Sequence, residues 1–283
     1  MEDLNFARPK YNSIYDPAIA LAFFKAAGTQ ESVAQGSKFF SENEKAGGLF
    51  SKGDKMYLLL EGEISLTVKN KTIGKIDQGQ IFGEMASISQ APRSATAVAK
   101  TSCRVISVDE KQFQKAIQKA PDFALMLMSI VINRLRQVIT ELSGNSALAD
   151  EATLSKRSVF DKKMLAEIAT EFEGNPPQHA PKNKVVMKEG DVGAFMYVVL
   201  EGRILVTIKN RPVERLVAGG VLGEMALVDQ SPRIASAMAE EDASLLAINR
   251  KDFLALIKSK PDFSLSLLKG LAERLKQMNA QLG

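Results

Sequence analysis

An internal repeat is the feature of this sequence that most constrains its fold. Residues 82–97 read FGEMASISQAPRSATA, and residues 222–237, 140 positions later, read LGEMALVDQSPRIASA. Nine of the sixteen positions are identical, and only the pairs Ser87/Leu227, Ser89/Asp229 and Ser94/Ile234 differ strongly in character. A repeat at this distance indicates two copies of one domain rather than one large fold.

Composition limits the class of protein. A chain of 283 residues with 45% hydrophobic and 25% charged residues is typical of a globular protein long enough for two domains. The net charge of +4 is spread over 37 basic and 33 acidic residues. Since nothing resembles a concentrated basic face, we expect no direct contact with nucleic acid. No uninterrupted apolar run reaches the roughly 18 residues of a membrane span, so we expect no membrane association.

Two residues that occur once each argue against metal and redox chemistry. Cys103 is the only cysteine, which excludes an internal disulfide, a cysteine zinc site and a Cys-ligated iron–sulfur cluster. It lies in the alternating run CRVISV, which predicts a packed strand residue. His179 is the only histidine, and its surroundings, NPPQHAPKNK, favour a solvated linker loop. We therefore expect neither a metal nor a cofactor.

The apolar stretch Ala18–Ala27 has the composition of a signal-peptide core, but its context argues otherwise. Asp16 and Lys25 interrupt the apolar region, and residues 160–172 hold the same place before the second repeat. A secretory signal would not be duplicated in the middle of a chain. Both stretches are interpreted as helices that open a domain, and the protein as cytoplasmic.

Short β-strands are predicted between these helices and the end of each repeat. Residues 57–69 and 72–76 favour strands around an Asn70-Lys71 turn, and residues 197–209 repeat the pattern before Asn210-Arg211. Gly62 and Gly202 stand at matching places where a strand could bend. Residues 103–108 and 244–248 are again β-like. Many short strands with close turn signals indicate a small antiparallel barrel or roll.

A long amphipathic helix is predicted to close each repeat, over residues 121–142 and 261–282. Both begin with proline and carry apolar residues at three- and four-residue spacing. The predicted fold is therefore α+β, mainly β: two tandem antiparallel β-roll or jelly-roll barrels, each with an N-terminal helix and a long C-terminal helix. We place the domains at residues 1–145 and 146–283. The apolar stripes of the long helices are expected to form core or helix–helix contacts: Met126, Met128, Ile130 and Leu135, and Leu267, Leu268, Leu271 and Leu275.

The duplication is interrupted at one place. Residues 39–44 match residues 186–191 at an offset of 147, whereas the offset downstream is 140. The first copy would then carry about seven extra residues within residues 45–55. A competing alignment sets FSKGD (50–54) against MKEGD and requires a three-residue deletion. We favour the insertion, because lengthening a surface hairpin costs little free energy.

The repeated signature suits a ligand with both a hydroxyl and an anionic phosphate. Arg93 or Arg233 supplies a planar, two-pronged donor that matches phosphate oxygens. A short helix begins after Gly83 or Gly223, so its first backbone N–H groups are free to point at the same anion. Glycine permits a close backbone approach. Glu84 or Glu224 can accept a hydroxyl. These features indicate a nucleotide.

Both halves resemble the cyclic nucleotide-binding domain shared by catabolite-activator-type bacterial regulators and the regulatory subunits of cAMP-dependent kinases. The resemblance rests on the phosphate-binding cassette, F/L-G-E-(L/M)-A followed by P-R-(small)-A-(T/S), with Glu and Arg nine residues apart in both copies. It implies that the glutamate accepts the ribose 2′-hydroxyl and that the arginine binds the cyclic phosphate. The implied cAMP-binding residues are Phe82, Gly83, Glu84, Met85, Ala86, Arg93, Ser94, Ala95, Leu222, Gly223, Glu224, Met225, Ala226, Arg233, Ile234 and Ala235.

The two predicted sites are not equivalent. Ser94 can add a hydroxyl to the phosphate, whereas Ile234 contributes no hydrogen bond and some crowding. Within the family a hydroxyl residue there occurs with cAMP and, usually as threonine, with cGMP, so Ile234 does not favour cGMP. We expect cAMP in both sites. Ser87 is interpreted as a tolerated surface or edge position. For the base, the conceivable contacts are Asn133, Arg134, Asn279 and Gln281.

The resemblance implies a receptor whose helix after the barrel moves to cap the nucleotide. The sequence has no segment after the second long helix for a helix-turn-helix, so we expect regulation of an unidentified effector protein rather than of DNA. Pairing is open between a homodimer and an intramolecular contact of the two domains through the long helices. The alternatives are a degenerate scaffold that binds no nucleotide, and a receptor for cGMP or a cyclic dinucleotide. An enzyme on a cupin-like barrel is disfavoured, because the repeated core has no Ser-His or Cys-His pair.

Overall fold

The computed structural model describes residues 15–44, 55–89, 92–144, 154 and 156–282. The chain divides into two compact units, residues 1–126 and 127–283, and each is described by itself. The division falls inside helix α4 (Pro121–Gly144), whose residues from Leu127 onward belong to the second unit. The domain boundary at residue 145 lies at the end of that helix and stays a prediction about the repeat.

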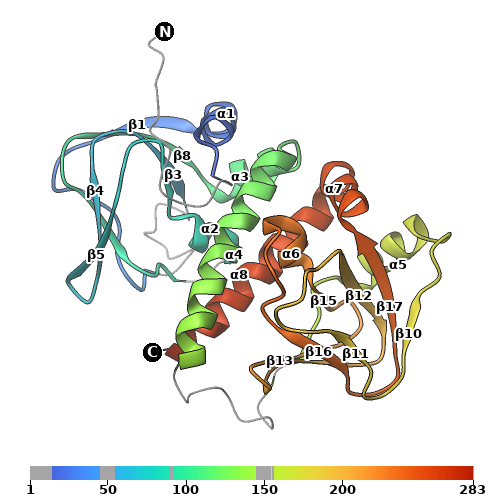
Figure 1. The fold of residues 1–283 in the computed structure, drawn as a ribbon. Coiled ribbons are helices and arrows are strands. Elements are labelled where there is room, and N and C mark those ends of the chain that lie inside the picture. The colour runs from blue at the N-terminus through green and yellow to red at the C-terminus, as the bar shows by residue number, and fades with distance from the viewer. Residues whose placement is uncertain (1–14, 45–54, 90–91, 145–153, 155, 283) are drawn as a thin grey trace. The chain divides into compact units, whose positions relative to one another are not determined.

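The first unit contains two four-stranded antiparallel sheets (Figure 1), with strand orders β1-β8-β3-β6 and β2-β7-β4-β5. This two-sheet arrangement is the predicted roll. The strands are β1 (Thr29–Val33), β2 (Lys38–Phe40), β3 (Met56–Glu61), β4 (Ile64–Val68), β5 (Lys71–Ile76), β6 (Ile81–Phe82), β7 (Thr96–Ala99) and β8 (Cys103–Val108).

The second unit repeats both sheets in the same order, β10-β17-β12-β15 and β11-β16-β13-β14-β9. The additional strand β9 pairs in parallel with β14 at the edge of the second sheet. The strands are β9 (Lys156–Arg157), β10 (Gln178–Ala180), β11 (Val185–Met187), β12 (Phe195–Glu201), β13 (Ile204–Ile208), β14 (Arg211–Leu216), β15 (Val221–Leu222), β16 (Ser236–Ala239) and β17 (Ala243–Asn249).

Helices open and close each roll, as the sequence predicts. Asp16 caps α1 by accepting a hydrogen bond from the Ala18 backbone N–H (2.8 Å), and Asp161 caps α5 in the same way. The remaining bounds are α1 (Pro17–Ala27), α2 (Glu84–Ser89), α3 (Glu110–Ile117), α5 (Lys162–Glu171), α6 (Glu224–Asp229), α7 (Arg250–Ser259) and α8 (Pro261–Leu282).

The long predicted strands are each divided at a glycine. Gly62 and Gly202 adopt left-handed backbone angles, with φ of 98° and 83°, between β3 and β4 and between β12 and β13. This confirms the predicted bends. The following hairpin turn lies one residue earlier than predicted, since Lys69 and Asn70 have positive φ and β5 already begins at Lys71. Two successive residues with positive φ suit the twist of a two-residue hairpin.

Aromatic and aliphatic side chains fill the cores. Phe23 of α1 stacks on Phe123 at the start of α4, with ring centroids 3.7 Å apart, and in the second unit Phe160 stacks on Phe263. Cys103 is buried in β8, as predicted. His179 is exposed but lies in strand β10, so its placement in a linker loop was wrong. Pairing with β17 draws this segment into the sheet.

The long helices carry their apolar stripes inward. Every stripe residue predicted on α4 and α8 is buried, except for Ile130, which is half-buried. Residues 121–142 of α4 are long and apolar enough, by length and composition, to cross a membrane, although polar residues interrupt the run. Because 61% of its apolar 18-residue window is buried inside the protein, a core helix accounts for its composition.

Candidate functional site

Each cassette begins with a glycine that makes room for an arginine. Gly83 and Gly223 follow β6 and β15 and have φ of 74° and 81°, a region that residues with a side chain rarely adopt. A Cβ on Gly83 would lie 2.9 Å from Arg93 Nη1, and one on Gly223 would overlap the guanidinium of Arg233. The local fold therefore requires glycine at both positions for backbone angle and for space.

The two arginines are anchored identically. Arg93 donates from Nη1 to the Gly83 carbonyl (2.7 Å) and from Nη2 to the Lys55 carbonyl (2.9 Å). Arg233 donates from Nη1 to the Gly223 carbonyl (2.5 Å) and from Nη2 to the Phe195 carbonyl. Both side chains are thus held along the edge of the roll, next to the helix that begins with the cassette glutamate.

Backbone bonds to the same arginines locate the predicted insertion. Arg93 N–H donates to the Glu44 carbonyl, and Arg233 N–H donates to the Asp191 carbonyl. Glu44 therefore matches Asp191, while Lys55 matches Phe195. Residues 45–54 separate the first two anchors and residues 192–194 separate the second two, so the first copy carries seven extra residues. This confirms the favoured alignment and excludes the three-residue deletion. The insertion itself lies outside the described residues.

In the first cassette an aromatic ring supports the arginine. The guanidinium carbon of Arg93 lies 4.3 Å from the centre of the Phe40 ring, within the range of a cation–π interaction. Phe82, Glu84, Ala86, Arg93 and Ala95 are buried, whereas Met85 is half-buried and Ser94 is exposed. Burial raises the pKa of the neighbouring Tyr57 to about 12, although the positive charge of Arg93 acts in the opposite direction.

Ser87 does not occupy a surface or edge position, and that prediction was wrong. It is only 3% exposed. It lies on the same inward side of α2 as Leu227 does on α6, where Leu227 is 1% exposed. The sequence signal for this burial was the hydrophobic Leu227 at the equivalent position, because matched positions in two copies of one fold have similar burial.

All eight residues predicted in the second cassette line one pocket of about 60 Å³. The pocket also receives Glu214 from β14, Arg274 and Met278 from α8, and Leu135, Arg136 and Ile139 from α4. Ligand pockets commonly measure roughly 300–1,000 Å³. A nucleotide would therefore require this pocket to open. Nucleotide binding by the predicted residues of both cassettes stays a prediction.

Arg233 is a buried cation with neutral partners. It is 7% exposed, and among the described residues it forms no ion pair. Burial lowers its pKa, which the charges of Tyr197, Glu224 and Asp191 partly offset. The two carbonyl bonds leave further N–H donors on the guanidinium. A buried charge without a carboxylate partner is costly, so this position favours a bound anion.

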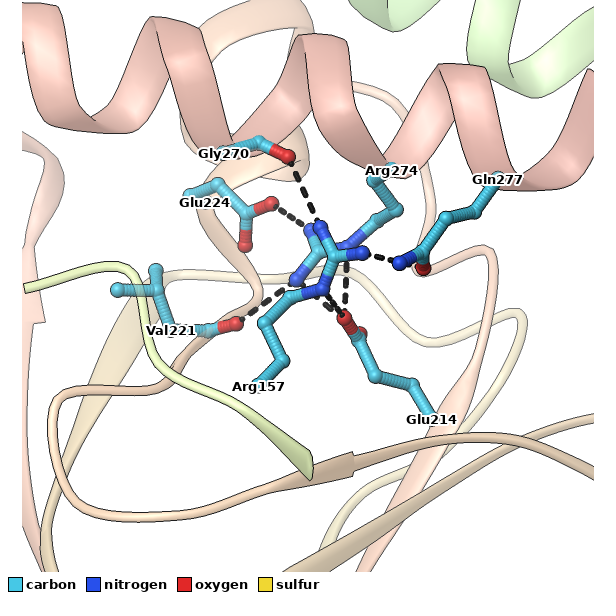
Figure 2. A network of polar contacts seen from close by, with 7 residues as sticks. All are labelled: Arg157, Glu214, Val221, Glu224, Gly270, Arg274 and Gln277. Atoms are coloured by element: carbon cyan, nitrogen blue, oxygen red, sulfur yellow. Dashed lines mark hydrogen bonds and ion pairs between the residues drawn. The ribbon is translucent and has the colours of Figure 1, made fainter. Parts of the chain in front are cut away.

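Glu224, by contrast, already has a cationic partner (Figure 2). Arg274 of α8 donates from Nη1 to Glu224 Oε1 (2.5 Å) and from Nη2 to the Val221 carbonyl (3.2 Å). The same guanidinium reaches Glu214, with Nη2 3.2 Å from Oε2. Burial alone would lower the pKa of Arg274, but Glu214 and Glu224 outweigh it and the pKa is raised. Helix α8 is thereby tied to the cassette glutamate.

A second arginine completes this network from the edge strand β9. Arg157 Nε lies 2.6 Å from Glu214 Oε1. Arg157 also donates to the Gly270 carbonyl (3.2 Å) and to the Gln277 side chain, both on α8. Burial lowers the pKa of Arg157, against the opposing effect of Glu214. Arg157, Glu214, Arg274 and Glu224 are called the charge quartet below.

Sequence reasoning missed Arg136, which ties α4 to the second cassette. Its Nε lies 2.6 Å from Asp229 Oδ2, its Nη2 donates to Oδ1 (3.1 Å), and its Nη1 donates to the Pro232 carbonyl (3.1 Å). The signal was the unlike pair Ser89/Asp229 in the repeat. Of the conceivable base contacts, Asn279 does not line the second pocket, and the side chain of Gln281 lies outside the described part. Asn133 and Arg134 belong to the helix of the first repeat and stay predictions for the first site.

The architecture and its cassettes define a class of protein: two β-rolls in one chain, each with a buried cassette arginine and a buried cassette glutamate. A family model for the cyclic nucleotide-binding domain matches residues 31–120 and 177–260. The chain belongs to this family and contains two tandem cyclic nucleotide-binding domains.

Similar proteins include cyclic nucleotide-dependent kinases. The chain is 27% identical over 226 residues to a cGMP-dependent protein kinase of Eimeria tenella, covering 78% of this chain and 20% of the kinase. It is 26% identical over 220 residues to a cAMP-dependent protein kinase regulatory subunit of Pyricularia oryzae, covering 72% of this chain and 51% of that protein. The chain thus spans a fifth of the first relative and half of the second.

Among solved structures, the chain is similar to the regulatory domain of Toxoplasma gondii PKA crystallised with cAMP. The two share 20% sequence identity with a TM-score of 0.32, and the match covers 89% of this chain and 88% of that one.

In the described residues, no group of three or more histidine, cysteine, aspartate or glutamate side chains is arranged to hold a metal ion.

Proposed function

We propose that this protein is a non-catalytic, cytoplasmic cAMP receptor that changes conformation on binding and thereby regulates a partner protein. The cassette arginine would bind the cyclic phosphate and the cassette glutamate would accept the ribose 2′-hydroxyl. We propose a protein partner rather than DNA. One relative is a cGMP-dependent protein kinase, and the other is the regulatory subunit of a cAMP-dependent protein kinase. Contact between two copies of this chain, or pairing of its own long helices, belongs to the same proposal.

The single observation that carries this proposal is Arg233. A buried guanidinium with only two carbonyl partners, beside a buried carboxylate and at the wall of a pocket, is prepared for an anion that also carries a hydroxyl. Arg93 has the same two anchors in the first copy, which extends the argument to both sites.

The choice of cAMP over cGMP rests on the residue after the arginine. Relatives of both specificities match the chain, so overall similarity does not decide the nucleotide. Ile234 lines the second pocket and offers no hydroxyl. Ser94 does offer one in the first copy, so cGMP should compete better at the first site than at the second.

A second candidate function is a scaffold whose second domain binds no nucleotide. It is favoured by one observation: Glu224 is held by Arg274, and the pocket measures only about 60 Å³. In this reading the charge quartet replaces the ligand, and α8 is fixed against the roll. The calorimetric titration described next distinguishes the receptor from the scaffold.

The test is calorimetric titration of cAMP and cGMP into the wild type, Arg93→Ala, Arg233→Ala and the double variant. Two sites per chain are expected in the wild type, one in each single variant and none in the double variant. Removing one partner of a buried charge contact costs about 2–5 kcal/mol, enough to abolish a site in the usual concentration range.

The matched control is Arg104→Ala, which removes an exposed arginine that pairs with Glu61 away from the cassette. It should bind both equivalents. If wild-type protein takes up no cyclic nucleotide, the receptor function is wrong. One equivalent that is lost only with Arg93→Ala would instead establish a receptor with a closed second domain.

A further inference from the structure

The charge quartet is a property of the second copy only. Glu214 pairs across the hairpin with Val206, and the equivalent residue, Gly74, pairs with Leu66. The first copy therefore has no carboxylate at this place. A feature that distinguishes two otherwise matched sites should make them respond differently to the same ligand.

Arg157 reaches the quartet from β9, the first strand of the second unit. Its backbone is fixed in the sheet, because β9 pairs with β14 and the Val217 N–H donates to the Arg157 carbonyl (3.1 Å). Its side chain contacts Glu214 and two residues of α8 (Figure 2). Strand β9 and helix α8 are thus joined through one guanidinium.

The quartet is electrically balanced and closed to water. Two arginines face two glutamates, and the four side chains are between 4% and 12% exposed. Without Arg157, two buried carboxylates would share the single guanidinium of Arg274. Since an uncompensated buried charge is costly, Glu214 would then draw Arg274 away from Glu224.

One oxygen of Glu224 remains available for a ligand. Arg274 takes Oε1, and within the described part of the chain Oε2 accepts no hydrogen bond. A carboxylate that is fixed through one oxygen presents the other in a defined direction. A site with such an oriented acceptor distinguishes a ligand hydroxyl from its absence.

On the basis of the proposed function, we propose that Arg157 and Glu214 are positioning residues for the second site. By pairing with Glu214, Arg157 allows Arg274 to stay paired with Glu224. Oε2 of Glu224 is then held in the direction of the ribose 2′-hydroxyl. The discrimination of this site between cAMP and 2′-deoxy-cAMP then depends on a residue of β9 that does not touch the nucleotide. The first site, with Gly74, is independent of it.

The experiment measures the affinity ratio of cAMP to 2′-deoxy-cAMP by calorimetry, in an Arg93→Ala background that leaves only the second site. Arg157→Met keeps the length of the side chain and removes its charge. Because a hydrogen bond to a charged group is worth roughly 10- to 150-fold in affinity, Arg157→Met should lower the ratio by about tenfold or more. Arg157→Lys should largely retain it.

Glu214, the ion-pair partner of Arg157, supplies a variant for which the opposite result is expected. Glu214→Met leaves Glu224 as the sole carboxylate for Arg274, so the ratio should not fall. The double variant Arg157→Met/Glu214→Met removes a whole ion pair and restores the balance, and it should return the ratio to within about threefold of the background, since apolar replacement of a buried pair is tolerated. A merely structural role would predict damage in all three variants.

An unchanged ratio in Arg157→Met overturns the inference, as does a double variant that stays impaired. If Arg157→Met does not fold, Glu214→Met and the double variant still decide, because a fall in their ratios contradicts charge balance. If the Arg93→Ala background binds neither nucleotide while the wild type binds one equivalent, the second site has no ligand. The proposed function of that site then fails first, and the inference with it.

Discussion

At the scale of single residues, each cassette depends on the absence of a side chain. Gly223 is needed for its left-handed backbone angle and again because the guanidinium of Arg233 occupies the space of its missing Cβ. Gly190 has a similar angle, with φ of 86°, but a Cβ there would meet nothing within 4 Å. A side chain at Gly190 would therefore cause only backbone strain, whereas a side chain at Gly223 would also take the space of the Arg233 guanidinium.

We expect Gly223→Ala to abolish the second site and Gly190→Ala to preserve it. Both should lower the free energy of unfolding by about 1–2 kcal/mol, the cost of a left-handed residue with a side chain. Only Gly223→Ala also displaces Arg233. Thermal unfolding together with cAMP titration checks both effects. Equal binding by the two variants would mean that the close approach of glycine and arginine is not required.

The residues of the cassettes could be predicted from the sequence because they recur. Gly223, Glu224 and Arg233 each have a counterpart 140 positions earlier, and the structure places all three at one pocket. Arg274 also has a counterpart 140 positions earlier, Arg134, but the repeat does not say which residues this arginine contacts. Arg274 contacts Glu214, whose counterpart is a glycine, and no local spacing connects β14 with α8. Such contacts arise from tertiary packing alone.

At the scale of elements, the connection between β2 and β3 differs most in length from its counterpart. Glu44 and Lys55 are the backbone anchors of Arg93, and residues 192–194 (Val-Gly-Ala) suffice between the matching anchors in the second unit. We expect replacement of residues 45–54 by Val-Gly-Ala to leave the first unit folded. Shortening a connection from ten to three residues changes its closure free energy by only about 1 kcal/mol.

The control for this graft is Val-Ala-Ala. A Cβ on Gly193 would overlap the guanidinium of Arg233, so the middle glycine should be needed beside Arg93 as well. Urea unfolding compares the stabilities, and titration compares the first site. If both grafts bind cAMP equally, the middle glycine is not needed beside Arg93.

The contact of α4 with α6 gives a second prediction for elements. The side chain of Asp229 is only 3% exposed, and its bidentate partner is Arg136. Arg136→Met should lower the free energy of unfolding by about 1–3 kcal/mol, because it leaves a buried carboxylate with fewer donors. Arg136→Met/Asp229→Ser, which installs the residue found at position 89, should recover most of that loss in urea unfolding. Additive losses in the double variant would contradict a direct interaction.

Element boundaries were predicted well where glycine, proline or aspartate mark them. Asp16 caps α1, and Gly62 divides the long predicted strand. The parallel strand β9 was not predicted, because the dipeptide Lys156–Arg157 carries no β-like pattern. It becomes a strand through its hydrogen bonds with β14, and those depend on how the unit packs rather than on local propensity.

At the scale of the whole molecule, the helix that ends the first repeat contributes to the second unit. Leu135 and Ile139 are buried and line the second pocket together with Arg136. A fragment of residues 127–283 should therefore be more stable than one of residues 146–283, by at least about 3 kcal/mol from the lost apolar burial. Urea unfolding of the two fragments decides between the compact unit and the repeat boundary. Equal stability would favour the boundary at residue 145.

The unequal spacing between the arginine anchors suggests a use in protein engineering. The carbonyls of Glu44 and Lys55, which both accept from Arg93, are separated by ten residues, whereas those of Asp191 and Phe195, which both accept from Arg233, are separated by three residues. The roll therefore accepts added chain at a point directly beside a buried guanidinium. A fluorescent reporter spliced between Val192 and Gly193, or into residues 45–54, would be attached where an arriving anion changes the local charge. An optical sensor for cyclic nucleotides could be built from either half.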